Sequence, residues 1–310
     1  FYFSQDSIFH PSVNIRFDIQ EKEMILSRGD RGSDRNPFFS SIHEINIDAD
    51  KIYAYLDRDS VVIGKEAIQI ARKKDIFFES HDYFNENEYR RIQNIAPFNP
   101  IAIMKVTAER EGNNFIDANL LAQRINSKFT VDNIQSLLYD LSAKGFINYN
   151  SEEEIVEVKD KVFHYADADQ GKVDYDDLRI RSATDSANAV LNLQNNEITI
   201  NGIEHIEFSR RQKVALLPEN GQINLLPDRN MDFSGKMYAG FSTLEGNGFH
   251  FDYKRFQIEL DSVAYFDLFV PTGEFDKDRN PLANGITSRI ENLSGVLLID
   301  APNNKSGKED

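Results

Sequence analysis

The spacing of apolar residues changes twice along the chain, and this change limits the possible folds more than any other feature. Up to about residue 64, apolar residues alternate with polar ones, as Val13, Ile15 and Phe17 do in the stretch VNIRFDI. A period of two predicts half-buried β-strands. From about residue 85 the apolar residues recur at helical spacing, and from about residue 186 the period of two returns. We therefore expect two β regions separated by a helical region.

The clearest helical stretch is TVDNIQSLLYDLSAKG, residues 130–145. Thr130 can cap its start, and Gly145 can end it. Four apolar residues fall at i, i+3, i+4 and i+7 and form one stripe, namely Ile134, Leu137, Leu138 and Leu141. Earlier stretches, including one that starts at Pro100, also have helical spacing, and a β-hairpin with an NSEEE turn follows. The sequence thus predicts three helices and then a hairpin.

This order of elements, over about residues 98–162, resembles the winged-helix fold, which often reads nucleic acid. Charge argues against that role here, because residues 117–162 hold five basic and eight acidic residues. The wing tip would be Glu152, Glu153 and Glu154, and Asp132 would lie at the start of the reading helix. Binding to phosphates needs clustered Lys or Arg. The resemblance therefore implies a structural or protein-binding module, with no nucleic acid as partner.

The two β regions share a short echo, in which Asp-Ser precedes an apolar run at Asp6, Asp59 and Asp261. If this echo is a structural repeat, the helical region is an insertion into one continuous β framework. We expect an α+β fold that is mostly antiparallel, built as a β meander or a solenoid-like stack, with an inserted winged-helix-like helical subdomain. The expected divisions are a first β region (1–84), the helical subdomain (85–165), an acidic linker (166–185), a second β region (186–270), and a loop with a polar tail (271–310).

One acidic stretch, DADQGKVDYDD, carries the weak metal candidates Asp167, Asp169 and Asp174. A glycine among spaced carboxylates is typical of calcium loops. Here the glycine comes one residue early, and no glutamate closes the loop at the twelfth position. The favoured interpretation is a solvated linker, so no metal site is predicted.

Other catalytic patterns are missing from the sequence. There is no cysteine, no HExxH and no glycine loop that ends in Gly-Lys-Ser/Thr. The six histidines are scattered. We therefore predict no catalytic residue and no cofactor. The formal net charge of −16 repels phosphate and anionic lipid, and no apolar run is long enough for a transmembrane helix.

Strands rich in Asn, Asp, Ile, Phe and Tyr resemble segments of the large β-repeat proteins of Gram-negative cell envelopes, notably those of Bacteroidota-type bacteria. This resemblance implies a non-catalytic structural or protein-interaction segment of a longer protein, periplasmic or on the cell surface, with protein partners. Two alternatives stay open. A β-helical protein that binds or cleaves polysaccharide would use aromatic residues such as Tyr238, Phe241, Phe249, Phe251 and Tyr253. A lipid-handling groove would line one sheet face with apolar residues, for example those of FHFDYKRFQI.

Overall fold

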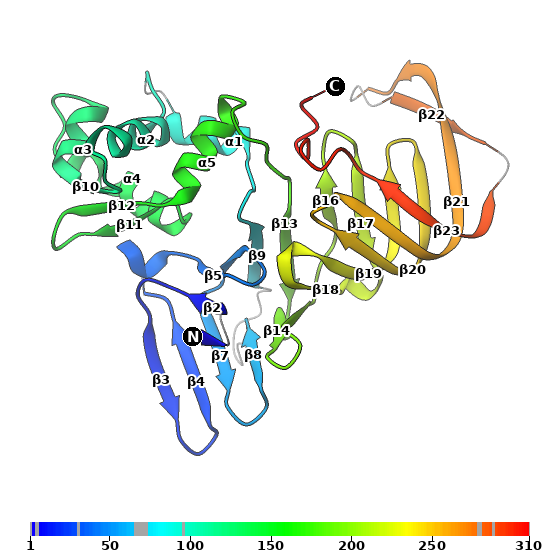
Figure 1. The fold of residues 1–310 in the computed structure, drawn as a ribbon, viewed down its shortest axis with the longest axis horizontal. Helices are drawn as coiled ribbons and strands as arrows, with labels where there is room; N and C mark the ends of the chain where they lie inside the picture. Colours follow the sequence, from blue (N-terminus) through cyan, green and yellow to red (C-terminus); the bar gives the residue numbers. More distant parts are fainter. Residues whose placement is uncertain are drawn as a thin grey trace.

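A computed structural model describes residues 2–3, 6–29, 32–64, 74–94, 97–277, 281–286 and 289–309. Strands make up 45% of the structure and helices 21%, and all strand ladders among these residues are antiparallel. The prediction of a mostly antiparallel α+β fold is therefore confirmed. Two sheets and a helical unit make up the molecule (Figure 1).

The smaller sheet has six strands in the order β1-β2-β5-β6-β9-β13. Their bounds are β1 Tyr2–Phe3, β2 Asp6–Phe9, β5 Phe38–Ser40, β6 Ile45–Asp48, β9 Lys74–Ser80 and β13 Arg179–Thr184. Alternate residues point into the core, as Ile45 and Ile47 do in β6. A short 3-10 helix, η1 (Gly32–Arg35), precedes β5.

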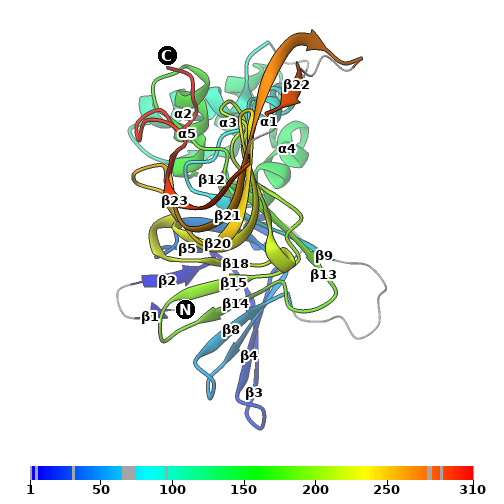
Figure 2. The same cartoon turned by 90° about the vertical axis from the view of Figure 1, so that its right-hand side faces the viewer.

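The larger sheet has fourteen strands and runs along the whole molecule (Figure 2). Its main path, from one end to the other, is β3 Asn14–Asp18, β4 Glu23–Ser27, β7 Lys51–Tyr55, β8 Ser60–Ile63, β14 Ala189–Asn192, β15 Glu197–Ile200, β18 Ile223–Leu225, β19 Met231–Ala239, β20 Ser242–Asp252, β21 Gln257–Phe275 and β22 Pro281–Gly285. Three strands pair beside this path, namely β16 Ile206–Ser209, β17 Val214–Pro218 and β23 Ile290–Leu298. The 3-10 turns η2 (Glu219–Gly221) and η3 (Pro227–Arg229) flank β18.

One hydrophobic core lies between the two sheets. Apolar residues from the small sheet, such as Phe78, belong to the same buried cluster as residues of the large sheet, such as Ile63 and Phe251. Strands such as β6, β8 and β14 therefore bury one face each, as their period predicts. The apolar stretch around Phe249 and Ile258, proposed above as a groove lining, is part of this filled core.

The helical unit lies between β9 and β13 and has a core of its own. Its elements are α1 Glu86–Gln93, α2 Pro100–Glu111, β10 Phe115–Asp117, α3 Ala118–Ile125, α4 Val131–Ala143, β11 Ile147–Asn150, β12 Ile155–Val158 and α5 Asp160–Asp169. The three strands form a small sheet in the order β10-β12-β11. In α4, Leu138 and Leu141 are fully buried, and Thr130 forms a capping box with Asn133. The sequence predicts both this helix and the capping residue at its start.

The chain leaves the β framework and returns to it at neighbouring strands. β9 pairs with β13 over six residues, and β8 pairs with β14 over four. An isolated bridge joins Tyr83 to Asp176 at the base of the helical unit. The helical unit therefore lies between β9 and β13, two strands that pair with each other in the small sheet. The Asp-Ser echo is not the reason, because Asp6 starts β2, Asp59 lies in a turn and Asp261 lies within β21.

Two predicted boundaries are wrong. Residues 166–185 are not a linker, because α5 continues to Asp169 and β13 begins at Arg179. The many acidic residues suggested a solvated linker, but Leu178 and Ile180 in the same stretch belong to the hydrophobic core. Residues 271–310 are not a loop and tail either, since β21 continues to Phe275 and the strands β22 and β23 follow.

Candidate functional site

A buried polar cluster joins the two sheets beneath the helical unit. At its centre is Arg229, whose side chain is almost fully buried. Its Nη1 donates to Oδ2 of Asp82 at 2.6 Å, to the hydroxyl of Tyr253 at 3.0 Å and to Oγ of Ser80 at 3.2 Å. Its Nη2 pairs with Glu44, and the guanidinium lies 3.8 Å from the centre of the Tyr253 ring. Three separate segments of the chain therefore bind one arginine.

Asp176 completes this cluster and is fully buried. Its carboxyl accepts hydrogen bonds from Ser80 Oγ at 2.5 Å, from the Tyr253 hydroxyl at 2.7 Å and from the backbone N–H of Leu178 at 3.0 Å. Burial raises the pKa of Asp176 to about 6, since it disfavours the charged form more than the hydrogen bonds favour it. Burial also raises the pKa of the Tyr253 hydroxyl. The pKa of Asp82 is lowered, because Arg229 outweighs the effect of burial there.

The Asp176 carboxyl has the altered pKa of many catalytic acids. A catalytic acid must, however, reach the substrate. Asp176 has no exposed surface, and its oxygens are engaged by groups of the protein itself. The cluster therefore acts as a structural joint between the β framework and the return segment of the helical unit.

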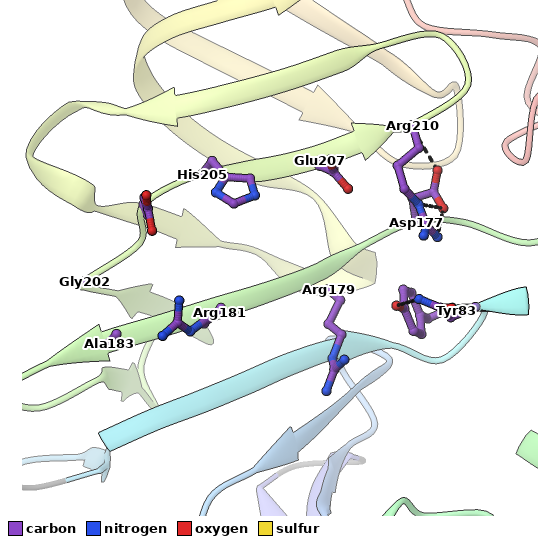
Figure 3. A pocket seen from close by; sticks show the side chains of 11 residues that line it. Tyr83, Asp177, Arg179, Arg181, Ala183, Gly202, His205, Glu207 and Arg210 are labelled. Carbon is purple, nitrogen blue, oxygen red and sulfur yellow. Dashed lines mark hydrogen bonds and ion pairs between the residues drawn. The ribbon is translucent and has the colours of Figure 1, made fainter. Parts of the chain in front are cut away.

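A polar cleft of about 240 Å³ opens beside this joint, between β13 and β16 (Figure 3). Arginine side chains dominate its lining, but each is paired. Arg179 lies 3.4 Å from Glu79, Arg181 lies 2.9 Å from Asp75, and Arg210 pairs with Asp177. Figure 3 shows Asp177 and Arg210 facing each other at one end of the cleft.

The charges of this cleft cancel. Glu204 and Glu207 line it as well, opposite the arginines of β13. A phosphate would have to displace carboxylates that already hold the guanidinium groups, which removes much of the gain from binding. The ion pairs join β13 to β9, and Arg210 and Asp177 join the segments that flank β16 and β13.

The three weak metal candidates do not converge. Asp167 pairs with Lys105 and lies 3.7 Å from Lys172. Asp174 accepts the backbone N–H groups of residues 305 and 306 at 2.6 and 3.1 Å, which fixes the C-terminal stretch to the helical unit. Asp169 is the last residue of α5. Within the described ranges no three His, Cys, Asp or Glu residues are grouped closely enough to hold a metal ion.

The face of the helical unit that would read nucleic acid is acidic and partly covered. Asp132 and the wing-tip residues Glu152, Glu153 and Glu154 are exposed. The 3-10 helix η1 packs against α4 and β11, with Ser33 Oγ donating to the carbonyl of Tyr149 at 3.2 Å. A duplex would therefore meet carboxylates, and part of α4 is already in contact with the β framework.

The aromatic residues proposed for a sugar or lipid groove are mostly interior. Phe249, Phe251 and Tyr253 are buried, and the first two contact other aromatic rings in the core. Tyr238 and Phe241 are partly exposed on β19 and the turn after it. These five side chains do not form one surface.

The end of the large sheet at β3 has a feature that the sequence did not reveal. Cross-strand neighbours Ile52, Leu26 and Ile15 share one face of the sheet. Their exposed fractions rise along this row from 1% to 9% to 64%. The next row ends at Phe17, which is 50% exposed. Among the described residues, the apolar face that forms the core thus continues onto β3 without cover. Alternation identifies a strand but does not distinguish a covered strand from an uncovered one.

Comparisons of the chain with models of protein families, with curated proteins and with solved structures gave no significant match. No helix in the described part of the chain is both long and apolar enough to cross a membrane.

Proposed function

We propose that this chain is a non-catalytic structural and protein-interaction segment of a larger protein of the cell envelope or cell surface. The observation that carries this proposal is the uncovered apolar face at β3. Soluble proteins seldom leave several large apolar side chains together on an edge strand, because such an edge promotes association. Ile15 and Phe17 lie on one face of β3, Ile19 follows in the turn, and all three are exposed.

The partner that fits this edge is an extended segment of another protein. β3 pairs with β4 on one side, and its other side is the end of the sheet. An added strand would receive main-chain hydrogen bonds and could place alternate apolar side chains beside Ile15 and Phe17. On the opposite face, Arg16 has no ion pair with any residue that the structure describes, so an acidic side chain of the partner would suit it.

The helical unit is proposed to be a winged-helix-like module used for structure or protein binding. Its order of elements, α2-β10-α3-α4-β11-β12, with β12 between β10 and β11, supports this assignment. The acids on α4 and the wing support a role other than reading nucleic acid. A periplasmic or surface location is proposed from the resemblance in composition to the β-repeat proteins of Gram-negative cell envelopes.

Site-specific photo-crosslinking in the producing cells tests the proposal. A photoreactive phenylalanine analogue replaces either Phe17 or Phe115, which is a matched control because it is 56% exposed on β10, away from the sheet end. We expect a discrete protein adduct from position 17 that is absent from position 115. Identical adducts at both positions, or none at position 17, would contradict the proposal.

A further inference from the structure

A second cleft, of about 450 Å³, lies between the small sheet and the helical unit. One wall comes from β2, β5 and β6, where Phe9, Phe39 and Asn46 follow one another across the strands. The other wall comes from β11, β12 and the start of α5. The volume falls within the range of about 300–1,000 Å³ that is usual for small-molecule sites.

The sheet wall of this cleft is aromatic. Phe9 is 50% exposed, and Phe39 beside it lies with its ring centre 5.8 Å from that of His81. Pro11 extends the same wall. Flat apolar surfaces of this kind pack against flat apolar faces of a ligand and orient it.

The opposite wall holds a lysine without a carboxylate partner. Nζ of Lys159 donates to Oδ1 of Asn36 at 3.3 Å, and no described carboxylate lies within 4.0 Å of it. Lys161, two residues away, differs in this respect, because its Nζ lies 2.5 Å from Glu79 and 4.7 Å from the centre of the Phe146 ring. A largely buried ammonium with one neutral acceptor is costly unless a ligand supplies the missing negative charge.

Other polar groups complete the lining. Glu157 accepts a hydrogen bond from Nδ2 of Asn148 at 2.6 Å, and Asp160 is exposed at the start of α5. Asn46 and Asn114 add amide groups. Burial, helped by the charge of Lys161 and opposed by the charges of Glu157 and Asp160, lowers the pKa of Lys159 to about 8, so Lys159 is still mostly protonated at neutral pH.

We propose that this cleft binds an acidic saccharide, with a pyranose ring against Phe9 and Phe39 and its carboxylate at Lys159. The ring's C–H face matches the aromatic wall. Its hydroxyl groups both donate and accept, as the amides and Glu157 require. The carboxylate pairs with Lys159, which has no described carboxylate within 4.0 Å. This site is separate from the sheet end at β3, and the two proposals can fail independently.

Titration calorimetry of the whole chain with trigalacturonate tests this proposal, with maltotriose as the neutral sugar and benzoate as the aromatic carboxylate. We expect trigalacturonate to bind, Lys159→Gln to weaken it about tenfold or more, and Lys159→Arg to restore part of the affinity. Lys172→Gln, which removes a lysine outside the cleft, should leave it unchanged. Binding of trigalacturonate should also weaken above pH 8.

Several results would overturn the proposal. Failure of trigalacturonate to bind at millimolar concentration would do so. Equal binding of maltotriose would show that Lys159 does not select the acid, and binding of benzoate alone would show that the ligand is not a saccharide. Phe9→Ala tests the aromatic wall, because Phe9 is half exposed and its loss should not unfold the protein. If this variant has unchanged thermal unfolding and unchanged affinity for trigalacturonate, the pyranose ring does not stack on Phe9.

Discussion

Replacing Asp176 by Asn should make the protein less sensitive to pH. The folded-state pKa of Asp176, about 6, lies above the ordinary value of 3.8, so between these values the folded protein holds a proton that the unfolded chain has lost. The stability due to this proton is complete below pH 3.8 and disappears as the pH rises through 6. A difference of about two pKa units corresponds to about 3 kcal/mol of unfolding free energy. Asparagine resembles the protonated acid and carries no such dependence.

Urea unfolding of both proteins between pH 4 and pH 8 measures this effect. We expect the stability of Asp176→Asn relative to the natural protein to rise with pH by about 3 kcal/mol, because all other titrating groups are common to both. Asp132→Asn, on the exposed start of α4, is the control for loss of one carboxylate. A difference that is constant with pH would refute the argument from burial. A difference that falls with pH would mean that Arg229 and the hydrogen bonds stabilise the charged form of Asp176 more than burial disfavours it.

Three further predictions concern the helical unit and the acidic stretch. Leu138→Ala should lower the unfolding free energy by about 2–5 kcal/mol, because the side chain is fully buried; a change within experimental error in urea unfolding would place the stripe on the surface. Labelled duplex DNA should not bind specifically at physiological salt, and sequence-dependent binding with a Kd below about 1 μM would contradict the electrostatic argument. Calcium should not bind with micromolar affinity in calorimetry. Micromolar binding that is lost in Asp169→Asn would show that the acidic stretch is a calcium site after all.

The sequence was sufficient for features that depend on neighbouring residues. The apolar stripe of Ile134, Leu138 and Leu141 and the cap at Thr130 together predict α4, and the structure has this helix and its capping box. Period-two alternation likewise predicts the strands of both β regions. Each of these signals lies within one turn of helix or one strand.

The joint and both interaction sites were not predictable in this way. Arg229 and Glu44 are 185 residues apart, and Tyr253 and Asp176 are 77 apart. Their contact depends on how the sheets pack, which no local pattern records. The acids of residues 166–185 looked like a solvated linker because composition does not show that Asp174, Asp176 and Asp177 each meet a donor from a distant segment.

The exposure of Ile15 is a second feature that local sequence patterns do not predict. Its pattern of alternation is the same as that of a covered strand, but no described segment packs over this part of the sheet face. Edge and interior strands with one buried face have the same period, so the sequence could not distinguish them.

Hydrogen exchange of the β3 backbone tests the interaction proposal most directly. The amides of residues 14–18 are compared in the isolated chain and in the chain isolated together with the protein that crosslinks at position 17, and α4 serves as the internal reference. If β3 accepts a partner strand, the N–H groups facing away from β4 exchange quickly in the isolated chain and slowly in the complex, whereas exchange in α4 is the same in both. Equally fast exchange of β3 in both preparations would contradict the proposed role of the sheet end.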